Sequence, residues 1–351
     1  MKQALKYTFG TMLLAGLSVP AVAHRHGHER PYINHSAVWI TGTYTETDNN
    51  AMSMGDQWFQ QASNANAADA GRRTIFLDPD AKFDFAVGYS YHIPHSHSRF
   101  FITYDHYRAD DENTSTGNML NLGVPLVNFS PFNNNSAYGR VDQKSDELRI
   151  GFSHRMGMSP KFNVDLSAFF EWDDVERTLY ETINTPTGGA DFRTRTTHSE
   201  VEGWGPGVGV MTNLRPFCNL HWGFFVGLKT ALIWADNDWD QIAFSATEPT
   251  FGGLLYNYTP ESSNSMIGKL DIKFGIDYCT AIRSDLGHYL FEAELGMRYM
   301  NMFNAFKNGN TAFNQQSQFE SVNDNAIFTG SAVDFSRVGP FLTFKIGGMG
   351  S

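Results

Sequence analysis

Charged side chains of both signs occupy alternate positions along several stretches of the chain. Lys269, Asp271 and Lys273 form one such series, and the residues between them, Leu270 and Ile272, are apolar. In an extended strand, side chains two residues apart point to the same face, so the charges would share one face. A face that carries both signs can form ion pairs or line a polar passage. The candidates for this charged face are Lys82, Asp84, Arg99, Asp105, Glu147, Arg149, Arg155, Asp165, Glu171, Asp173, Lys229, Lys269, Asp271, Lys273, Asp277, Glu292, Glu294, Arg298 and Lys345.

Motifs that would indicate enzymatic or metal chemistry are incomplete. The glycines of residues 203–209 alternate with other residues and do not form the G-x-G-x-x-G loop that holds a phosphate. The segment Asp236–Asp240 begins like a calcium-binding loop. Gln241 stands where that loop needs glycine, however, and Thr247 stands where it needs a bidentate glutamate. We therefore expect no catalytic residue, no metal ion and no cofactor, and we do not expect an enzyme.

The stretch KFDFAVGYSYHI, residues 82–93, shows the kind of element that must position the charges. Phe83, Phe85 and Val87 alternate with Asp84 and Ala86, which is the period of a β-strand with one apolar face. The pattern recurs and predicts about ten strands of about 9–14 residues, with eight or twelve strands as alternatives. The expected strands lie at 36–44, 82–93, 98–108, 146–156, 161–172, 200–213, 221–234, 268–279, 288–299 and 337–347.

Short and long connections alternate between these strands. The long ones are rich in Asn, Ser, Thr and Gly, and they lie near 45–80, 109–143, 174–198, 236–264 and 302–335. Short periplasmic turns that alternate with long extracellular loops are typical of an antiparallel up-and-down barrel in an outer membrane. Since lipid cannot satisfy backbone hydrogen bonds, the strands must close on themselves. The aromatic face would then contact lipid, and the charged face would line the lumen.

Tryptophan spacing agrees with a membrane of ordinary thickness. Trp222 and Trp234 share a face and lie twelve residues apart. At about 3.3 Å per residue and a tilt of about 45°, they are separated by roughly 28 Å along the membrane normal. Trp rings favour the two interfaces of a membrane. We expect Trp172, Trp204 and Trp234 in the outer aromatic girdle and Trp222 in the inner one.

The N-terminal segment and the overall charge indicate export. Residues 1–23 combine Lys2 and Lys6, an apolar stretch and the small-residue site Ala21-Val22-Ala23, as in a cleavable secretory signal peptide. Residues 24–351 are expected to form a single barrel domain in the outer membrane of a Gram-negative bacterium. The net charge of −11 argues against nucleic acid as a partner.

Two cysteines fall near the periplasmic rim of the predicted barrel. Cys218 precedes the strand at 221–234, and Cys279 ends the strand at 268–279. Exported cysteines meet an oxidising compartment. The residues alone leave three states open for Cys218 and Cys279, namely an intramolecular disulfide, intermolecular cross-links and free thiols.

Two hairpins resemble the Legionella-type major outer membrane proteins. They are EGWGPGVGVMTNLRPFCNLHWGFFVGLKTALIWAD, residues 202–236, and FAVGYSYHIPHSHSRFFITYDHY, residues 85–107. The first has a Gly-x-Gly-Pro strand, a turn and an aromatic, glycine-rich strand, and the second has a glycine-tyrosine strand and an aromatic return strand. The resemblance implies an outer-membrane barrel with a porin-like or surface-exposed role. It also favours intermolecular cross-links by the cysteines.

The sequence is compatible with three functions. The leading one is a porin-like or major structural and surface protein, and its partners would be membrane lipid, lipopolysaccharide and small hydrophilic solutes or ions. The second is a plugged barrel whose loops bind host or cell-envelope molecules, as an adhesin does. The third is a barrel hydrolase resembling the omptins, and its rim candidates are Asp173, Asp174, Asp236, Asp238 and His198. Whether the barrel forms oligomers is open in each case.

Overall fold

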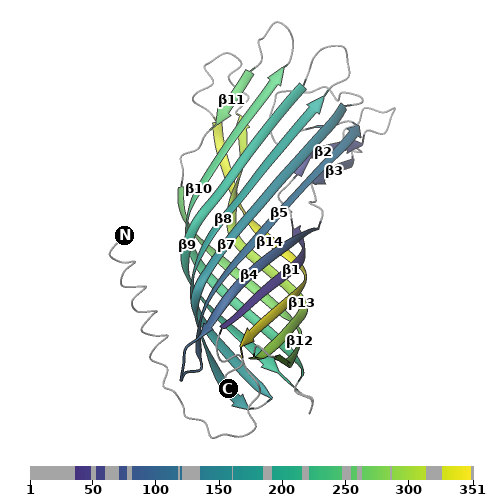
Figure 1. Ribbon diagram of the computed structural model, residues 1–351. Helices are drawn as coiled ribbons and strands as arrows, with labels where there is room; N and C mark the ends of the chain where they lie inside the picture. The colour runs from purple at the N-terminus through teal and green to yellow at the C-terminus, as the bar shows by residue number, and fades with distance from the viewer. Residues whose placement is uncertain are drawn as a thin grey trace.

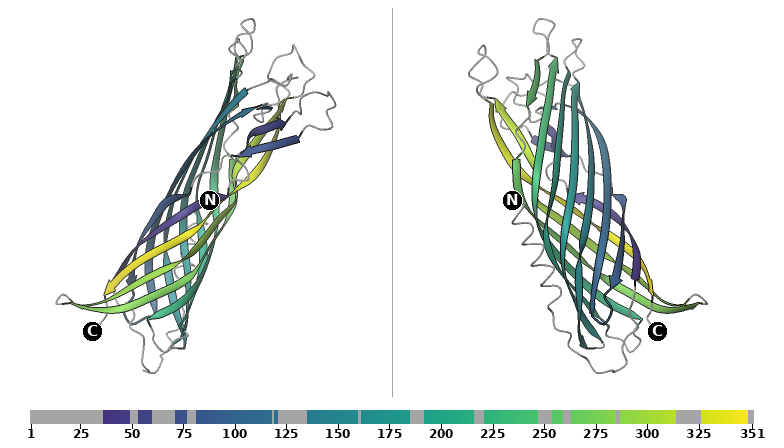
Figure 2. Two further views of the ribbon diagram at one scale, coloured as in Figure 1. Left: turned by 90° about the vertical axis from the view of Figure 1, so that its right-hand side faces the viewer. Right: turned by 60° about the vertical axis from the view of Figure 1, so that its left-hand side comes forward.

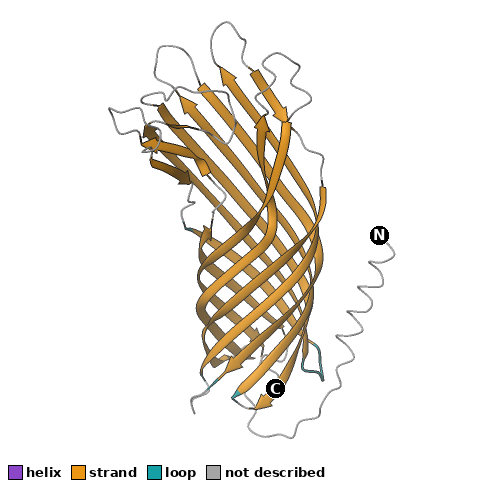
Figure 3. Ribbon diagram, turned by 180° about the vertical axis from the view of Figure 1, so that it is seen from behind, coloured by secondary structure: helices purple, strands orange, loops and turns teal. Residues whose placement is uncertain are grey.

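The computed structural model describes residues 36–48, 53–59, 71–76, 81–117, 119–120, 135–159, 161–184, 192–215, 221–246, 254–258, 263–284, 287–313 and 326–348. Nearly all of these residues form strands (Figure 3), and none of them forms a helix long and apolar enough to cross a bilayer. The predicted signal peptide, residues 1–23, lies outside the described residues.

Fourteen strands follow one another along the described chain (Figure 1). They are β1 Ser36–Asp48, β2 Ser53–Phe59, β3 Gly71–Phe76, β4 Lys82–His92, β5 Ser98–Gly117, β6 Met119–Leu120, β7 Asn135–Ser159, β8 Phe162–Asn184, β9 Phe192–Leu214, β10 Trp222–Ala246, β11 Leu254–Tyr258, β12 Ser263–Ser284, β13 Gly287–Phe313 and β14 Ala326–Gly348.

Ten of these strands close a barrel. The order around the wall is β10-β12-β13-β14-β1-β4-β5-β7-β8-β9, and β9 pairs again with β10. Each neighbouring pair is antiparallel, and the first strand pairs with the last, for example Val38 with Ile346. Four short strands lie outside the ring: β2, β3 and β6 form a small separate sheet, and β11 pairs antiparallel with one end of β10. The predicted antiparallel ten-strand barrel is confirmed.

Most strands are longer than the sequence predicts. β8 has 23 residues and β13 has 27, so much of the sequence expected as long loops continues the barrel wall. Residues 174–184 and 236–246, for instance, belong to β8 and β10. Figure 2 shows the wall continuing past the closed part of the barrel at the extracellular end. The expectation of short strands was wrong because the polar residues of the added segments face outward, as loop residues also do.

The polarity of the wall inverts along the long strand β10. On β10, outward-facing Leu232 and Trp234 are followed on the same face by Asp236 and Asp238. The inner face of the added segment carries the buried Trp239 instead. Apolar residues face lipid where the wall crosses the membrane, and they face inward where water surrounds it.

We call the added part of the wall the extracellular extension. It comprises the segments of β5, β7, β8, β9 and β10 on the extracellular side of Tyr104, Leu148, Trp172, Trp204 and Trp234, respectively. The segments between these residues and the periplasmic turns form the membrane span.

An apolar core fills the interior beneath the extracellular extension and reaches into the membrane span, to which its members Phe101, Phe169 and Ile233 belong. The Phe335 ring packs 6.0 Å from Tyr107 and 5.8 Å from Phe306, centroid to centroid. The Arg177 guanidinium lies 4.3 Å from the centroid of the Phe306 ring. The buried members of this core are Phe101, Tyr107, Ala109, Phe169, Val175, Val201, Ala231, Ile233, Ala235, Ile267, Met300, Met302, Ala305, Phe306 and Phe335. The upper barrel is therefore packed like the interior of a water-soluble protein.

A charge placed on the outer face of β10 should report where the membrane ends. Leu228 lies midway between Trp222 and Trp234 on the exposed face, so Leu228→Arg is expected to cost about 2–4 kcal/mol of unfolding free energy. Asp238→Arg, on the same face of the extension, should change it by less than about 1 kcal/mol. Urea unfolding in lipid vesicles measures both values. Equal losses would contradict the assigned boundary.

Candidate functional site: the charged lumen

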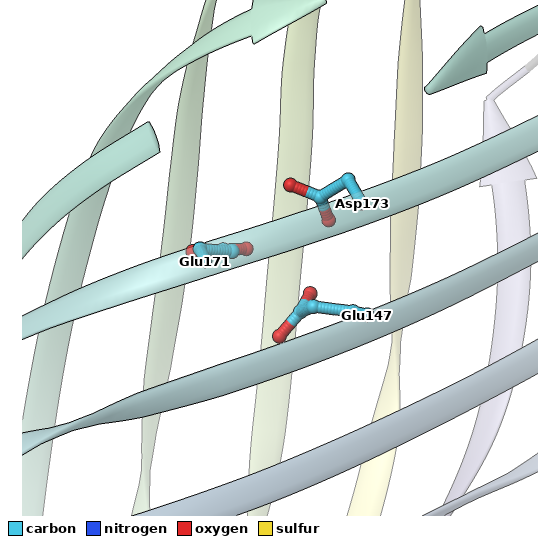
Figure 4. Close-up of side chains that lie close together, drawn as sticks. All are labelled: Glu147, Glu171 and Asp173. Carbon is cyan, nitrogen blue, oxygen red and sulfur yellow. The ribbon is translucent and has the colours of Figure 1, made fainter. Parts of the chain in front are cut away.

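Three carboxylates from two neighbouring strands converge inside the barrel. Glu171 and Asp173 lie two residues apart on β8, and Glu147 of β7 is the register partner of Asp173. Figure 4 shows the three side chains turned toward one another. We call this group the carboxylate cage. Its carboxylate oxygens lie within 4.8 Å of one another, so the cage needs a cation.

Lys269 of β12 supplies that cation. Its Nζ lies 2.6 Å from Glu147 Oε2 and 2.5 Å from Asp173 Oδ1, and it also donates to Glu171. Lys269 is 2% exposed and Asp173 is fully buried. The lysine ammonium thus occupies the position that a metal ion would otherwise take among these ligands.

Arginines continue the ion pairs across the lumen. Arg149 Nε lies 2.8 Å from Glu147 Oε1, and its Nη1 lies 2.9 Å from Asp271 Oδ2. Arg298 Nη2 lies 2.9 Å from the same Asp271 oxygen, and Arg298 also pairs with Asp105. Side chains from distant parts of the wall therefore meet in one network.

Arg337 joins this network to the apolar core. Its Nη1 lies 3.4 Å from Asp105 Oδ1 and 4.0 Å from Asp84 Oδ2, and its guanidinium lies 5.0 Å from the centre of the Tyr107 ring. We call the whole network the ion-pair layer. Its members are Asp84, Asp105, Glu147, Arg149, Glu171, Asp173, Lys269, Asp271, Arg298 and Arg337.

Ion pairing offsets the free-energy cost of burying these charges. A buried charge left without a partner is strongly destabilising, because its desolvation is not compensated. The layer contains six carboxylates and four cations. If all were ionised, the lumen at this level would carry a net negative charge.

A second set of charges lines the periplasmic half of the lumen. Arg155 Nε lies 2.8 Å from Asp165 Oδ1, and Arg99 Nη2 lies 2.8 Å from Asp165 Oδ2. Lys345 Nζ lies 3.0 Å from Glu292 Oε2. Lys273 pairs in the same way with Glu294, at 3.2 Å. These groups surround a cavity of about 220 Å³.

The remaining lumenal candidates occupy different surroundings. Lys229 lines the same cavity, and within the described part of the chain it forms no ion pair. Asp277 pairs with Arg215, and both are buried near the periplasmic end. Lys82 instead lies at the extracellular end of β4, where its Nζ is 3.5 Å from Asp110 and 38% of its side chain is exposed. Lys82 is therefore not part of the ion-pair layer.

Sequence patterns missed two partners in the lumen. Arg337 follows the same alternation as Phe341 and Thr343 on β14, so that spacing could have placed it inside. Arg215 follows the end of β9, and no pattern marks it.

The alternating glycines of β9 provide space for packing. A Cβ atom on Gly207 would lie 2.3 Å from an atom of the Phe169 ring. Glycine at this position therefore lets Phe169 pack into the apolar core.

The tryptophans gather at two levels of the wall. Trp172, Trp204 and Trp234 are successive register partners on β8, β9 and β10, and the Trp204 and Trp234 ring centroids are 5.8 Å apart. Trp222 lies at the other end of β10, 4.9 Å from the Tyr278 ring. These are the positions that an outer and an inner girdle would take.

Only one of the two cysteines lies within the described residues. Cys218 lies outside the described residues, and Cys279 is buried on β12 near the periplasmic end. An intramolecular disulfide remains a prediction, as do the other two states.

The acid–histidine set proposed for a hydrolase is divided between two faces of the wall. Asp173 belongs to the carboxylate cage inside the barrel, whereas Asp236 and Asp238 lie on the outer face of β10. His198 also faces outward, where its Nδ1 lies 3.1 Å from Thr178 Oγ1. Asp174 faces outward on β8 as well. One substrate could not contact Asp173 and the outward residues together.

The sequence of the whole barrel matches a known family. A profile described as the Legionella pneumophila major outer membrane protein precursor matches residues 36–348. The chain belongs to this family. Its members are outer-membrane proteins, and the expected location in the outer membrane is confirmed. No curated protein sequence matches the chain.

Three solved structures match the chain at low identity and low TM-score. The outer membrane protease OmpT from Escherichia coli is 7% identical, with 92% of this chain and 98% of that chain covered and a TM-score of 0.38. The translocator domain of the autotransporter NalP from Neisseria meningitidis is 10% identical, with 98% and 96% covered and a TM-score of 0.32. A FadL homologue from Pseudomonas aeruginosa is 10% identical, with 90% and 91% covered and a TM-score of 0.23.

Removing the cation from the carboxylate cage should destabilise the barrel. Lys269→Ala leaves three buried carboxylates facing one another, so we expect a loss of about 3–5 kcal/mol of unfolding free energy. Lys82→Ala removes a cation whose side chain is 38% exposed and whose partner Asp110 is 55% exposed, and it should cost less than about 1 kcal/mol. Urea titration followed by Trp fluorescence compares the two. A loss for Lys269→Ala no larger than that for Lys82→Ala would refute the role of the cage.

Proposed function

We propose that the protein is a structural and surface-displaying barrel of the outer membrane, and that its lumen is closed at rest. The observation that carries this proposal is the stacking of two filled layers inside one narrow barrel. The side chains of Glu147, Arg149 and Lys269 are 1%, 3% and 2% exposed in the ion-pair layer. Beyond that layer lies most of the apolar core, including Phe306 and Phe335.

Barrel size supports the same proposal. Eight strands enclose a lumen that side chains fill, whereas wide aqueous channels need about sixteen strands. This barrel has ten strands, and its inward positions carry long Arg, Lys and Glu side chains. These side chains can span the lumen and pair across it.

The extracellular extension favours a surface role. Its outer face is polar, its interior is packed, and the small sheet of β2, β3 and β6 stands beside its end of the barrel (Figure 1). A rigid wall that projects beyond the membrane holds surface segments away from the lipid. Under this proposal, host or cell-envelope molecules would bind at that end.

A porin-like passage is the second candidate function. The cavity of about 220 Å³ in the periplasmic half is lined by charged groups and ends at the ion-pair layer. Movement of that layer and of the apolar core would connect the cavity to the outside. Because carboxylates outnumber cations in the layer, such a passage would favour cations.

Single-channel recording in a planar bilayer tests the closed state. The refolded wild-type protein should give no stable conductance steps, because both filled layers block the lumen. Frequent steps that scale with salt concentration would contradict the proposal and favour the porin-like passage. Heat-modifiable migration in electrophoresis shows beforehand that the barrel has folded.

A further inference from the structure

A hollow of about 600 Å³ lies on the outer face of the extracellular extension, over β5, β7, β8 and β9. It belongs neither to the lumen nor to the apolar core. Three cations, two carboxylates and two tyrosines contribute to its lining. Its volume is within the range of small-ligand sites.

The hollow lies just beyond the membrane boundary. Arg108 is four residues past Tyr104 on β5, and Tyr138 is ten residues past Leu148 on β7. At about 3.3 Å per residue and a tilt of about 40°, the hollow spans roughly 10–25 Å outside the hydrocarbon. The phosphorylated sugars of lipopolysaccharide occupy this layer of the outer leaflet.

The cations of the hollow suit phosphate groups. Arg108 and Lys144 are register partners on β5 and β7. Lys144 Nζ lies 2.8 Å from Asp146 Oδ2, and this hydrogen bond raises the pKa of Lys144, which keeps the amine charged. Arg140 is exposed, and it forms no ion pair within the described residues. Its guanidinium can therefore bind a phosphate through two parallel hydrogen bonds.

The aromatic and acidic groups suit sugars. The Tyr138 and Tyr180 rings are 6.2 Å apart in an edge-to-face arrangement, and Tyr180 is 37% exposed. Exposed tyrosine rings offer a flat apolar face with a polar tip, on which the C–H face of a sugar ring can pack. The carboxylates of Asp142 and Glu176 can accept hydrogen bonds from sugar hydroxyls.

We propose that this hollow binds the phosphorylated sugars of lipopolysaccharide in the surrounding outer leaflet. The cations hold the phosphates, and the tyrosines and carboxylates hold the adjoining sugar rings. The hollow faces the leaflet from the side of the wall, which places it against lipopolysaccharide and not above the barrel mouth. The proposal does not depend on whether the lumen is open or closed.

Binding of a deacylated, phosphorylated lipopolysaccharide saccharide to the full chain in detergent micelles tests this site. The double variant Arg140→Ala/Lys144→Ala should bind the saccharide about tenfold more weakly or worse, because two charge-assisted hydrogen bonds are lost. Tyr180→Ala should also weaken binding. Lys82→Ala removes a cation outside the hollow and should leave the affinity unchanged.

Two competitors separate phosphosugar recognition from simpler ion binding. The dephosphorylated saccharide and inorganic phosphate should each compete poorly with the phosphorylated saccharide. The proposal is overturned if the double variant binds as tightly as the wild type. It is also overturned if either competitor binds as tightly as the phosphorylated saccharide. Heat-modifiable migration shows that each variant is folded before binding is measured.

Discussion

The hydrocarbon of the membrane offers no partner for a backbone N–H or C=O group, and the rest of the structure follows from that constraint. Ten strands satisfy it by closing on themselves, with β1 paired to β14 and β9 to β10. The outer face of the span must then be apolar, so the polar side chains of each strand turn inward. A ring of this size leaves them little room.

Crowding and low polarity explain the form of the ion-pair layer. A charge buried in the narrow lumen loses water, and counter-ions, most of them from other strands, offset that loss. Lys269 meets three carboxylates, and Asp271 is shared by Arg149 and Arg298. Beyond the membrane the constraint reverses, because water then surrounds the wall and apolar residues such as Phe306 and Phe335 take the interior. On β10 the outer face thus changes from apolar to polar just past Trp234.

Local spacing predicted much of this arrangement. The alternation around Lys269, Asp271 and Lys273 indicated an inward face. The alternation of short and long connections indicated a barrel of about ten strands. Strand length was not predictable, because outward Asp236 and Asp238 have the composition of a loop. The partners of Lys269 were not predictable either. Contact between Lys269 and its three carboxylate partners depends on the register of β7 and β8 and on the position of β12 around the ring. A local sequence pattern predicts neither.

The accessibility of the periplasmic half of the lumen from each side of the membrane tests most directly whether the lumen is closed. Ser167 lines the cavity below the ion-pair layer. A Ser167→Cys variant that retains no native cysteine can be inserted in vesicles with one orientation and treated with a charged, membrane-impermeant thiol reagent. A closed lumen predicts modification from the periplasmic side and none from the extracellular side. Equal modification from both sides would show that water passes through the layer and the core, and it would contradict a closed barrel.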